Sequence, residues 1–130
     1  MIEFHLDARS GVPTYLQLVH QVRQAVRLGL LLPGDQLPTV KEVVASLAIN
    51  PNTVLKAYRE LDREGLVEGR RGVGTFVSDT LPSPPTDGVK DLRAALRRWV
   101  ERARAAGLDD DGIAALVADT VRPPAVSRVA

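Results

Sequence analysis

The short junction before Asn50 constrains the fold most, because it separates two helix signals by only a few residues. Residues 39–42 (Thr-Val-Lys-Glu) have the form of a capping box, in which the Thr39 hydroxyl accepts from the Glu42 N–H and the Glu42 carboxylate reaches back. Asn50 and Pro51 then supply a polar N-cap followed by proline at the first helical position. Two helices joined by so short a turn must cross steeply, which predicts a helix-turn-helix unit.

A longer helix is expected before this unit and a β-hairpin after it. From Pro13 to about Leu30 the apolar residues recur at helical spacing, and Pro33-Gly34 prevents continuation. After Gly65, two short apolar segments flank a glycine-rich turn that carries arginines, which predicts a hairpin, or wing. The alternation of Ile2, Phe4 and Leu6 with polar residues also predicts a short strand at the N-terminus.

The second half of the chain predicts a linker followed by two helices. Residues 79–86 contain three prolines and are expected to form a stiff, extended linker. Residues 87–122 predict a helical hairpin whose apolar stripes are too wide to be buried within a two-helix unit, so a second copy of the chain is the simplest partner. Residues 123–130 lack periodicity and are expected to be disordered. The candidate dimerisation residues are Leu92, Leu96, Trp99, Val100, Ile113, Leu116 and Val117.

The predicted fold class is therefore mostly α with a small β wing (α+β). It comprises a winged helix-turn-helix domain over residues 1–78 and a short C-terminal two-helix dimerisation tail. The chain has 130 residues, no cysteine and no segment resembling a secretory leader or a membrane span, so a cytoplasmic protein is expected. Its net charge is only +1, and residues 1–80 hold nine cations and nine carboxylates, so any phosphate-binding surface must arise from local placement.

The third predicted helix carries the candidate base contacts. Short polar groups and cations on an exposed N-terminal half suit the major groove, and we expect Asn52, Thr53 and Lys56 to contact bases and Arg59 to contact the backbone. The alternative for the cations is an ordinary solvated helix face. Two roles are equally expected for Leu55: contact with a thymine methyl group, or a boundary position against the second helix.

Backbone contacts are expected around this helix. Asn50 is a cap that also directs the helix N-terminus towards a phosphate, while Thr39 and Lys41 lie in or beside the first turn of the second helix. For Lys41, an exposed cation that only contributes to solubility is an equal alternative to a contact with the DNA backbone. The wing turn is expected to approach the minor groove through the following residues: Arg70, Arg71, Gly72 and Gly74. The alternative is a plain hairpin that does not contact DNA.

Catalytic and metal chemistry have no candidate constellation. His5 and His20 are isolated, residues 109–111 are better explained as favourable acidic charge at a helix start, and no nucleophile, base and acid set stands out. We therefore expect no metal and no enzymatic activity. A pocket for an effector beside Trp99 is the minor alternative to packing there, and the sequence assigns no effector.

Taken together, these segments resemble the GntR family, and the short two-helix tail resembles its YtrA-like subfamily. The resemblance covers most of residues 10–78 and rests on the following segments: Pro13 to Leu18, Pro33 to Thr39, Asn50 to Val54, Ala57 to Leu61, Glu64 to Val67 and Gly72 to Val77. It implies a homodimeric repressor on a palindromic operator, with a helix of each copy in the major groove and wings at the minor groove, commonly controlling transporter genes. No cofactor is implied, because the chain ends too early for the aminotransferase-like domain of some members.

One position departs from the family pattern. Lys41 stands where the family usually has arginine, so bidentate guanine recognition there is not expected and a phosphate contact is. The main rival function is a winged-helix module for protein contacts, which the near-neutral charge favours.

Overall fold

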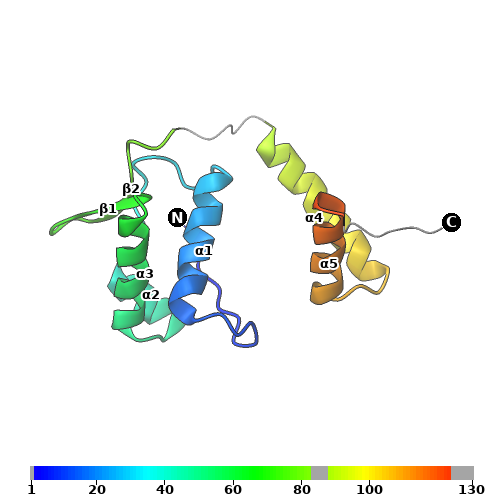
Figure 1. Cartoon of the computed structure of the whole chain (residues 1–130), viewed down its shortest axis with the longest axis horizontal. Coiled ribbons are helices and arrows are strands. Elements are labelled where there is room, and N and C mark those ends of the chain that lie inside the picture. Colours follow the sequence, from blue (N-terminus) through cyan, green and yellow to red (C-terminus); the bar gives the residue numbers. More distant parts are fainter. Residues whose placement is uncertain (1, 83–87, 124–130) are drawn as a thin grey trace. The chain divides into compact units, whose positions relative to one another are not determined.

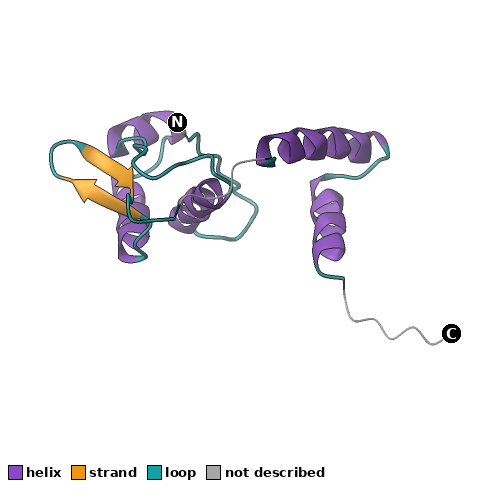
Figure 2. Cartoon of the chain, turned by 90° about the horizontal axis from the view of Figure 1, so that it is seen from above, coloured by secondary structure: helices purple, strands orange, loops and turns teal. Residues whose placement is uncertain are grey.

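The computed structural model describes residues 2–82 and 88–123 and divides into two units, Met1–Thr86 and Asp87–Ala130. The order of elements is α1 (Thr14–Arg27), α2 (Val40–Leu47), α3 (Pro51–Arg63), β1 (Val67–Arg70), β2 (Gly74–Val77), α4 (Val89–Ala105) and α5 (Asp110–Val121) (Figure 1). Figure 2 shows the two strands as one small hairpin beside otherwise helical structure. The predicted fold class, mostly α with a small β wing, is confirmed.

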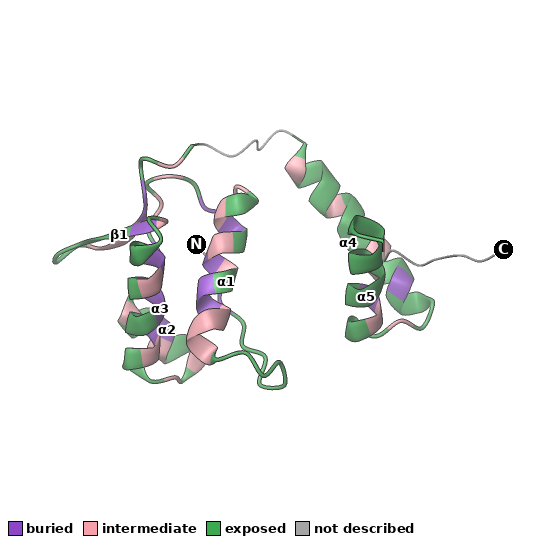
Figure 3. Ribbon diagram, viewed as in Figure 1, coloured by how far each residue is buried: buried purple, intermediate pink, exposed green. Residues whose placement is uncertain are grey.

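The core of the first unit lies between α1, α3 and the base of the wing. Its fully buried side chains come from α1 (Leu18, Val19 and Val22), from α3 (Val54 and Leu61), from β2 (Val77) and from the segment before α2 (Leu37). Figure 3 shows these helices buried along one face and exposed along the other. Apolar burial on one face of each helix therefore fixes which face of α3 is left to solvent.

The wing is a two-stranded antiparallel hairpin extended by a third segment. β1 and β2 pair from Val67 with Val77 to Arg70 with Gly74. Residues 34–37 run along the other edge of β2, where the Leu37 N–H donates to the Thr75 carbonyl at 2.8 Å and Gln36 forms a bridge with Phe76. The wing is thus anchored to the chain that leads into α2.

The predicted strand at Ile2, Phe4 and Leu6 is wrong. These residues form an extended arm without a strand partner, although Phe4 is buried in the core. The Gln21 side chain takes the place of a partner strand, because it accepts from the His5 N–H at 2.9 Å and donates to the His5 carbonyl at 2.6 Å. Alternation alone could not reveal that a glutamine amide would satisfy the backbone.

The first helix is shorter than predicted. It ends at Arg27 rather than near Leu30, because Leu28 caps it and Gly29 adopts φ 75°. A left-handed glycine just past the last turn is a common helix stop. The proline and glycine at 33–34 therefore lie beyond a helix that has already ended.

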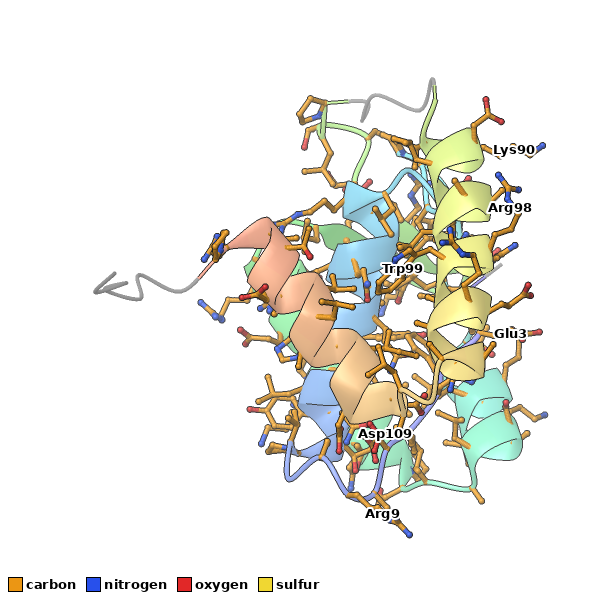
Figure 4. The ribbon with its side chains drawn as sticks, turned by 90° about the vertical axis from the view of Figure 1, so that its right-hand side faces the viewer. Glu3, Arg9, Lys90, Arg98, Trp99 and Asp109 are labelled. Atoms are coloured by element: carbon orange, nitrogen blue, oxygen red, sulfur yellow. The ribbon has the colours of Figure 1, made fainter. Side chains whose placement is uncertain are left out.

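The second unit is a helical hairpin formed by α4 and α5. Gly107, with φ 99°, follows α4, and the Asp109 carboxylate caps α5 by accepting from the Gly112 N–H at 2.8 Å. Figure 4 shows Asp109 at the start of α5, and Lys90 and Arg98 on the side of α4 away from Trp99. The prolines and terminal residues predicted as linker and disordered end fall largely at 83–87 and 124–130, outside the described residues.

Candidate nucleic-acid interface

The α3 helix has one face in the core and the opposite face in solvent. Val54, Ala57, Tyr58 and Leu61 are buried. The exposed face carries Asn52, Lys56 and Arg59, whereas Thr53 is half-buried. The spacing of three and four residues places the exposed side chains in one stripe along the helix.

The N-terminus of α3 is capped as predicted. The Asn50 side-chain oxygen accepts from the Asn52 N–H at 2.8 Å, and the Thr53 N–H donates to the Asn50 carbonyl at 3.0 Å. Because the amide oxygen of Asn50 is engaged in the cap, its NH₂ group remains as a donor for an anion. The Asn52 side chain stands exposed in the same turn.

Tyr58 fixes α3 against the chain entering α2. Its hydroxyl donates to the Pro38 carbonyl at 2.6 Å in a buried position. Burial raises the pKa of Tyr58 well above its ordinary value, because the charged phenolate would be desolvated. A neutral, hydrogen-bonded tyrosine thus fixes the chain that enters α2 against α3.

Lys56 contacts an aromatic side chain of the first helix. Its ammonium lies 4.1 Å from the centre of the Tyr15 ring, in cation–π geometry. Tyr15 belongs to α1 and is half-buried. Nothing in the spacing of residues 15 and 56 predicts this contact, because it depends on how α1 packs on α3.

The start of α2 forms the predicted capping box. The Glu42 N–H donates to the Thr39 hydroxyl at 3.1 Å, and the Thr39 N–H donates to the Glu42 carboxylate at 3.2 Å. Lys41 lies exposed in this first turn. The box therefore fixes the backbone from which the Lys41 side chain extends.

The two wing arginines differ in their surroundings. Arg70 lies 4.3 Å over the Phe76 ring and pairs with Glu68 at 3.4 Å and Asp79 at 3.3 Å. Arg71 lies in the exposed turn that follows β1. Arg70 is thus engaged with the wing itself, while Arg71 extends from its tip.

The glycines of the wing are required by its geometry. Gly72 turns the chain with φ 75°, and Gly74 has φ 144°. The φ of Gly74 is one that L side chains rarely adopt, and a Cβ there would lie 2.6 Å from the Gln36 side-chain nitrogen, which would have to move. The Gln36 side chain, which was not among the predicted site residues, therefore lies against the wing turn, where its amide donates to the Val73 carbonyl at 3.4 Å.

A shallow, open depression lies between the wing and the start of α2. It has a volume of about 630 Å³ and is lined by Thr39 and by residues 69–75 of the wing. Five residues predicted to contact DNA therefore border one depression: Thr39, Arg70, Arg71, Gly72 and Gly74.

The ion pairs of the first unit leave four of the predicted cations without a carboxylate. Arg23 pairs with Glu64 at 2.7 Å, Arg63 pairs with Glu60, and Arg70 pairs as described. Over residues 2–82 and 88–123, no carboxylate lies within 4.0 Å of the following cations: Lys41, Lys56, Arg59 and Arg71. Arg9 and Arg27 likewise have no carboxylate within 4.0 Å among the described residues, so four of the six unpaired cations of residues 2–82 lie at positions predicted to contact DNA.

The ion pairs also shift the pKa values of the side chains that they join. The hydrogen bond that Arg63 donates lowers the pKa of Glu60, and the hydrogen bonds that Arg23 donates to Glu64 raise the pKa of Arg23. The carboxylates of Glu60 and Glu64 therefore pair with Arg63 and Arg23 and not with the exposed stripe of α3.

The predicted dimerisation residues are mostly exposed in the single chain. Ile113 is buried, and Trp99 and Val100 are half-buried. The exposed members are Leu92, Leu96, Leu116 and Val117. The hairpin therefore presents a broad apolar surface, as its stripes predicted.

Two other features bear on the class of protein. Among the described residues, no group of three or more metal-ligating side chains comes together. No helix within the described ranges is both long and apolar enough to cross a membrane.

Comparison with known proteins identifies relatives over most of the chain. Residues 14–77 match the model of the family described as bacterial regulatory proteins, gntR family. The chain is 37% identical to the HTH-type transcriptional repressor YtrA of Bacillus subtilis, over 80% of this chain and 81% of that protein. It is 43% identical to the HTH-type transcriptional regulator Rv1152 of Mycobacterium tuberculosis, over 79% of this chain and 81% of that protein.

Solved structures agree with this result. YtrA from Sulfolobus acidocaldarius, a GntR-family transcription factor, matches 91% of this chain and 96% of its own with a TM-score of 0.55 and 29% identity. The AraR DNA-binding domain in complex with operator ORX1 matches 59% of this chain and 96% of its own, with a TM-score of 0.52 and 26% identity.

Proposed function

This chain belongs to the GntR family of bacterial regulatory proteins, and from that premise we propose that it represses transcription by binding a palindromic operator as a homodimer. As a family member it is a transcription regulator with a DNA-binding domain and not an enzyme. A repressor role is supported by its similarity to a protein named as a repressor. The proposed site of action is chromosomal DNA in the cytoplasm.

The observation that carries the proposal is the placement of unpaired positive charge. Lys41, Lys56, Arg59 and Arg71 lie on the start of α2, on the exposed face of α3 and at the wing tip, and the opposite face of α3 is core. Contacts from cations to phosphates supply most of the sequence-independent affinity for DNA. Four cations that have no carboxylate within 4.0 Å among the described residues remain available to bind the phosphates of a nucleic-acid backbone.

The contacts divide by element. We propose that α3 enters the major groove, where Asn52, Thr53 and Lys56 contact base edges. Arg59 and Lys41 bind phosphates, as do the free donors at Asn50 and the hydroxyl of Thr39. The wing approaches the minor groove through Arg71 at its tip, supported by the turn at Gly72 and Gly74, with Arg70 as a secondary contact because Asp79 and Glu68 already bind it.

The tail supports the homodimer. The apolar side chains of α4 and α5 cannot be buried within the hairpin, and a second identical hairpin offers a self-complementary surface. Two winged units joined in this way would meet two half-sites of an inverted repeat. The likeness to the YtrA-like branch further suggests control of membrane-transporter genes, which transcript profiling of a deletion strain would test.

The test is selection of bound sites from random duplex DNA, followed by affinity measurements on the selected and scrambled duplexes at several salt concentrations. We expect an enriched inverted repeat with half-sites about one helical turn or a small multiple apart. If a dimer binds about six phosphates, the logarithm of affinity should fall against the logarithm of salt with a slope of about −5. Weak binding without enrichment would favour a module for protein contacts.

Two variants separate the proposed roles on α3. Asn52→Ala should weaken binding to the selected site and relax its base preference, whereas Arg59→Ala should weaken binding to selected and scrambled DNA alike. Both residues are exposed, so the fold should persist. Equal losses on both duplexes for Asn52→Ala would contradict a base contact by this residue.

A further inference from the structure

Leu55 is an apolar residue on a face that is otherwise polar. It lies in α3 and is 38% exposed, while its neighbour Val54 is fully buried. Asn52 and Arg59, three residues before and four residues after Leu55, are exposed on the same side, and the adjacent Lys56 is exposed as well. Leu55 therefore stands within the stripe proposed to enter the major groove.

Leu55 is more exposed than the apolar residues of α2. Val43 of α2 is buried in the core and Val44 and Leu47 pack against it, whereas Leu55 keeps 38% of its surface exposed. Isolated exposed leucines are common on protein surfaces and need no explanation by themselves. Here the location matters, because Leu55 lies on the second turn of α3, the helix proposed to enter the major groove with its N-terminal half.

The chemistry of the major groove points to a partner for this side chain. Base edges there present hydrogen-bond donors and acceptors, and thymine adds the C5 methyl group, an apolar contact. The polar neighbours of Leu55 can form hydrogen bonds with the adjacent base edges. The isobutyl group of Leu55 forms no hydrogen bonds, so a favourable contact requires an apolar group on the DNA.

We propose that Leu55 determines specificity by packing against the C5 methyl group of one thymine in each operator half-site. This inference rests on the proposed function, because it requires α3 to lie in the major groove. The recognised chemistry is a methyl group at C5 of a pyrimidine, which deoxyuridine lacks and 5-methylcytosine shares.

The test replaces single thymines of the selected duplex by deoxyuridine, which removes the methyl group and keeps the base-pairing edge. When the contacted thymine is replaced in one half-site only, wild-type affinity should fall about three- to fourfold, the effect of one buried methyl group. Replacement in both half-sites should lower affinity on the order of tenfold. Leu55→Ala should bind thymine and deoxyuridine duplexes equally, and fluorescence anisotropy measures each affinity.

Two controls make the result specific. Leu55→Met keeps an apolar side chain of similar volume and should retain discrimination between thymine and deoxyuridine. Leu30→Ala removes another exposed leucine, 47% exposed and outside α3, and should leave discrimination at the wild-type level.

The outcomes separate this inference from the proposed function. If selection yields an enriched site but no deoxyuridine replacement weakens wild-type binding, the role of Leu55 is wrong and DNA recognition stands. If Leu55→Ala discriminates as strongly as wild type, the methyl contact belongs to another residue and the inference is likewise overturned. If no site is enriched at all, the proposed function and the role of Leu55 both fall.

Discussion

The two units of the chain bury their apolar residues to very different extents. In the first unit, Leu61 of α3 is 0% exposed and contributes to a continuous core. In the second, Leu92 and Leu96 of α4 are 71% and 51% exposed, and the buried apolar residues are Ala103 and Ile113. The exposed colouring of α4 and α5 in Figure 3 makes the contrast visible.

This difference teaches what each unit needs in order to be stable. The first unit has a core that α1, α3 and the wing complete by themselves. A hairpin of two helices is too small to bury both stripes, so its stability should depend on association. The DNA-binding domain and the proposed dimerisation surface thus lie in separate parts of one short chain.

The largest expected effect sharpens this contrast by making the same substitution in both units. Leu61→Ala should lower the free energy of unfolding by about 2–5 kcal/mol, because a fully buried leucine leaves a cavity. Leu92→Ala should change the stability of the first unit by less than about 0.5 kcal/mol, as for other exposed sites. Chemical denaturation followed by circular dichroism measures both, and equal losses would remove the distinction between the units.

A charge on the apolar face of α4 should break the assembly and leave the first unit folded. Leu96→Asp would bury a carboxylate in the proposed dimer interface, and we expect the dimer dissociation constant to rise about a hundredfold or more, since an unpaired buried charge is costly. Sedimentation equilibrium gives the constant. Arg98→Asp places the same charge two residues, or about 200° of helix rotation, away from Leu96, and a comparable loss there would argue against the assigned face.

Loss of the cap on α2 should have an intermediate effect. Thr39→Ala removes the hydroxyl that accepts from the Glu42 N–H and should cost about 1 kcal/mol. Thr39→Ser keeps the acceptor and should retain most of that stability. Thermal unfolding compares the two, and identical losses would show that the hydroxyl does not cap the helix.

The smallest expected effect concerns the ion pair between α1 and the end of α3. Arg23→Ala should lower stability by about 0.2–1 kcal/mol, because the pair with Glu64 is only partly buried. High salt should reduce the difference between the variant and wild type. A loss as large as that of Leu61→Ala would mean that the first unit depends on this pair more than on its core.

Local signals in the sequence predicted most of the fold. The capping box at Thr39, the Asn50 cap, the left-handed Gly65 and the glycine-rich wing are all present where their residues indicated. Each depends on interactions between residues close in sequence. The helix boundaries around α2 and α3 were therefore predictable.

Contacts between distant segments were not predictable in the same way. The Gln21 amide that holds the arm at His5, and the Tyr15 ring under Lys56, depend on the packing of α1. Engagement of Arg70 by Asp79 likewise requires the wing to fold back on the following residues. Residue type suggested which side chains bear charge, and tertiary structure decided which of them stay unpaired.

The most direct test of the central claim is the mass of the complex on a selected duplex, measured by sedimentation equilibrium at protein concentrations above saturation. Two chains per duplex, with an inverted repeat as the selected sequence, is the predicted result. One chain bound to a single unrepeated site would contradict the account, because the tail would then have no role in bringing two DNA-binding units together.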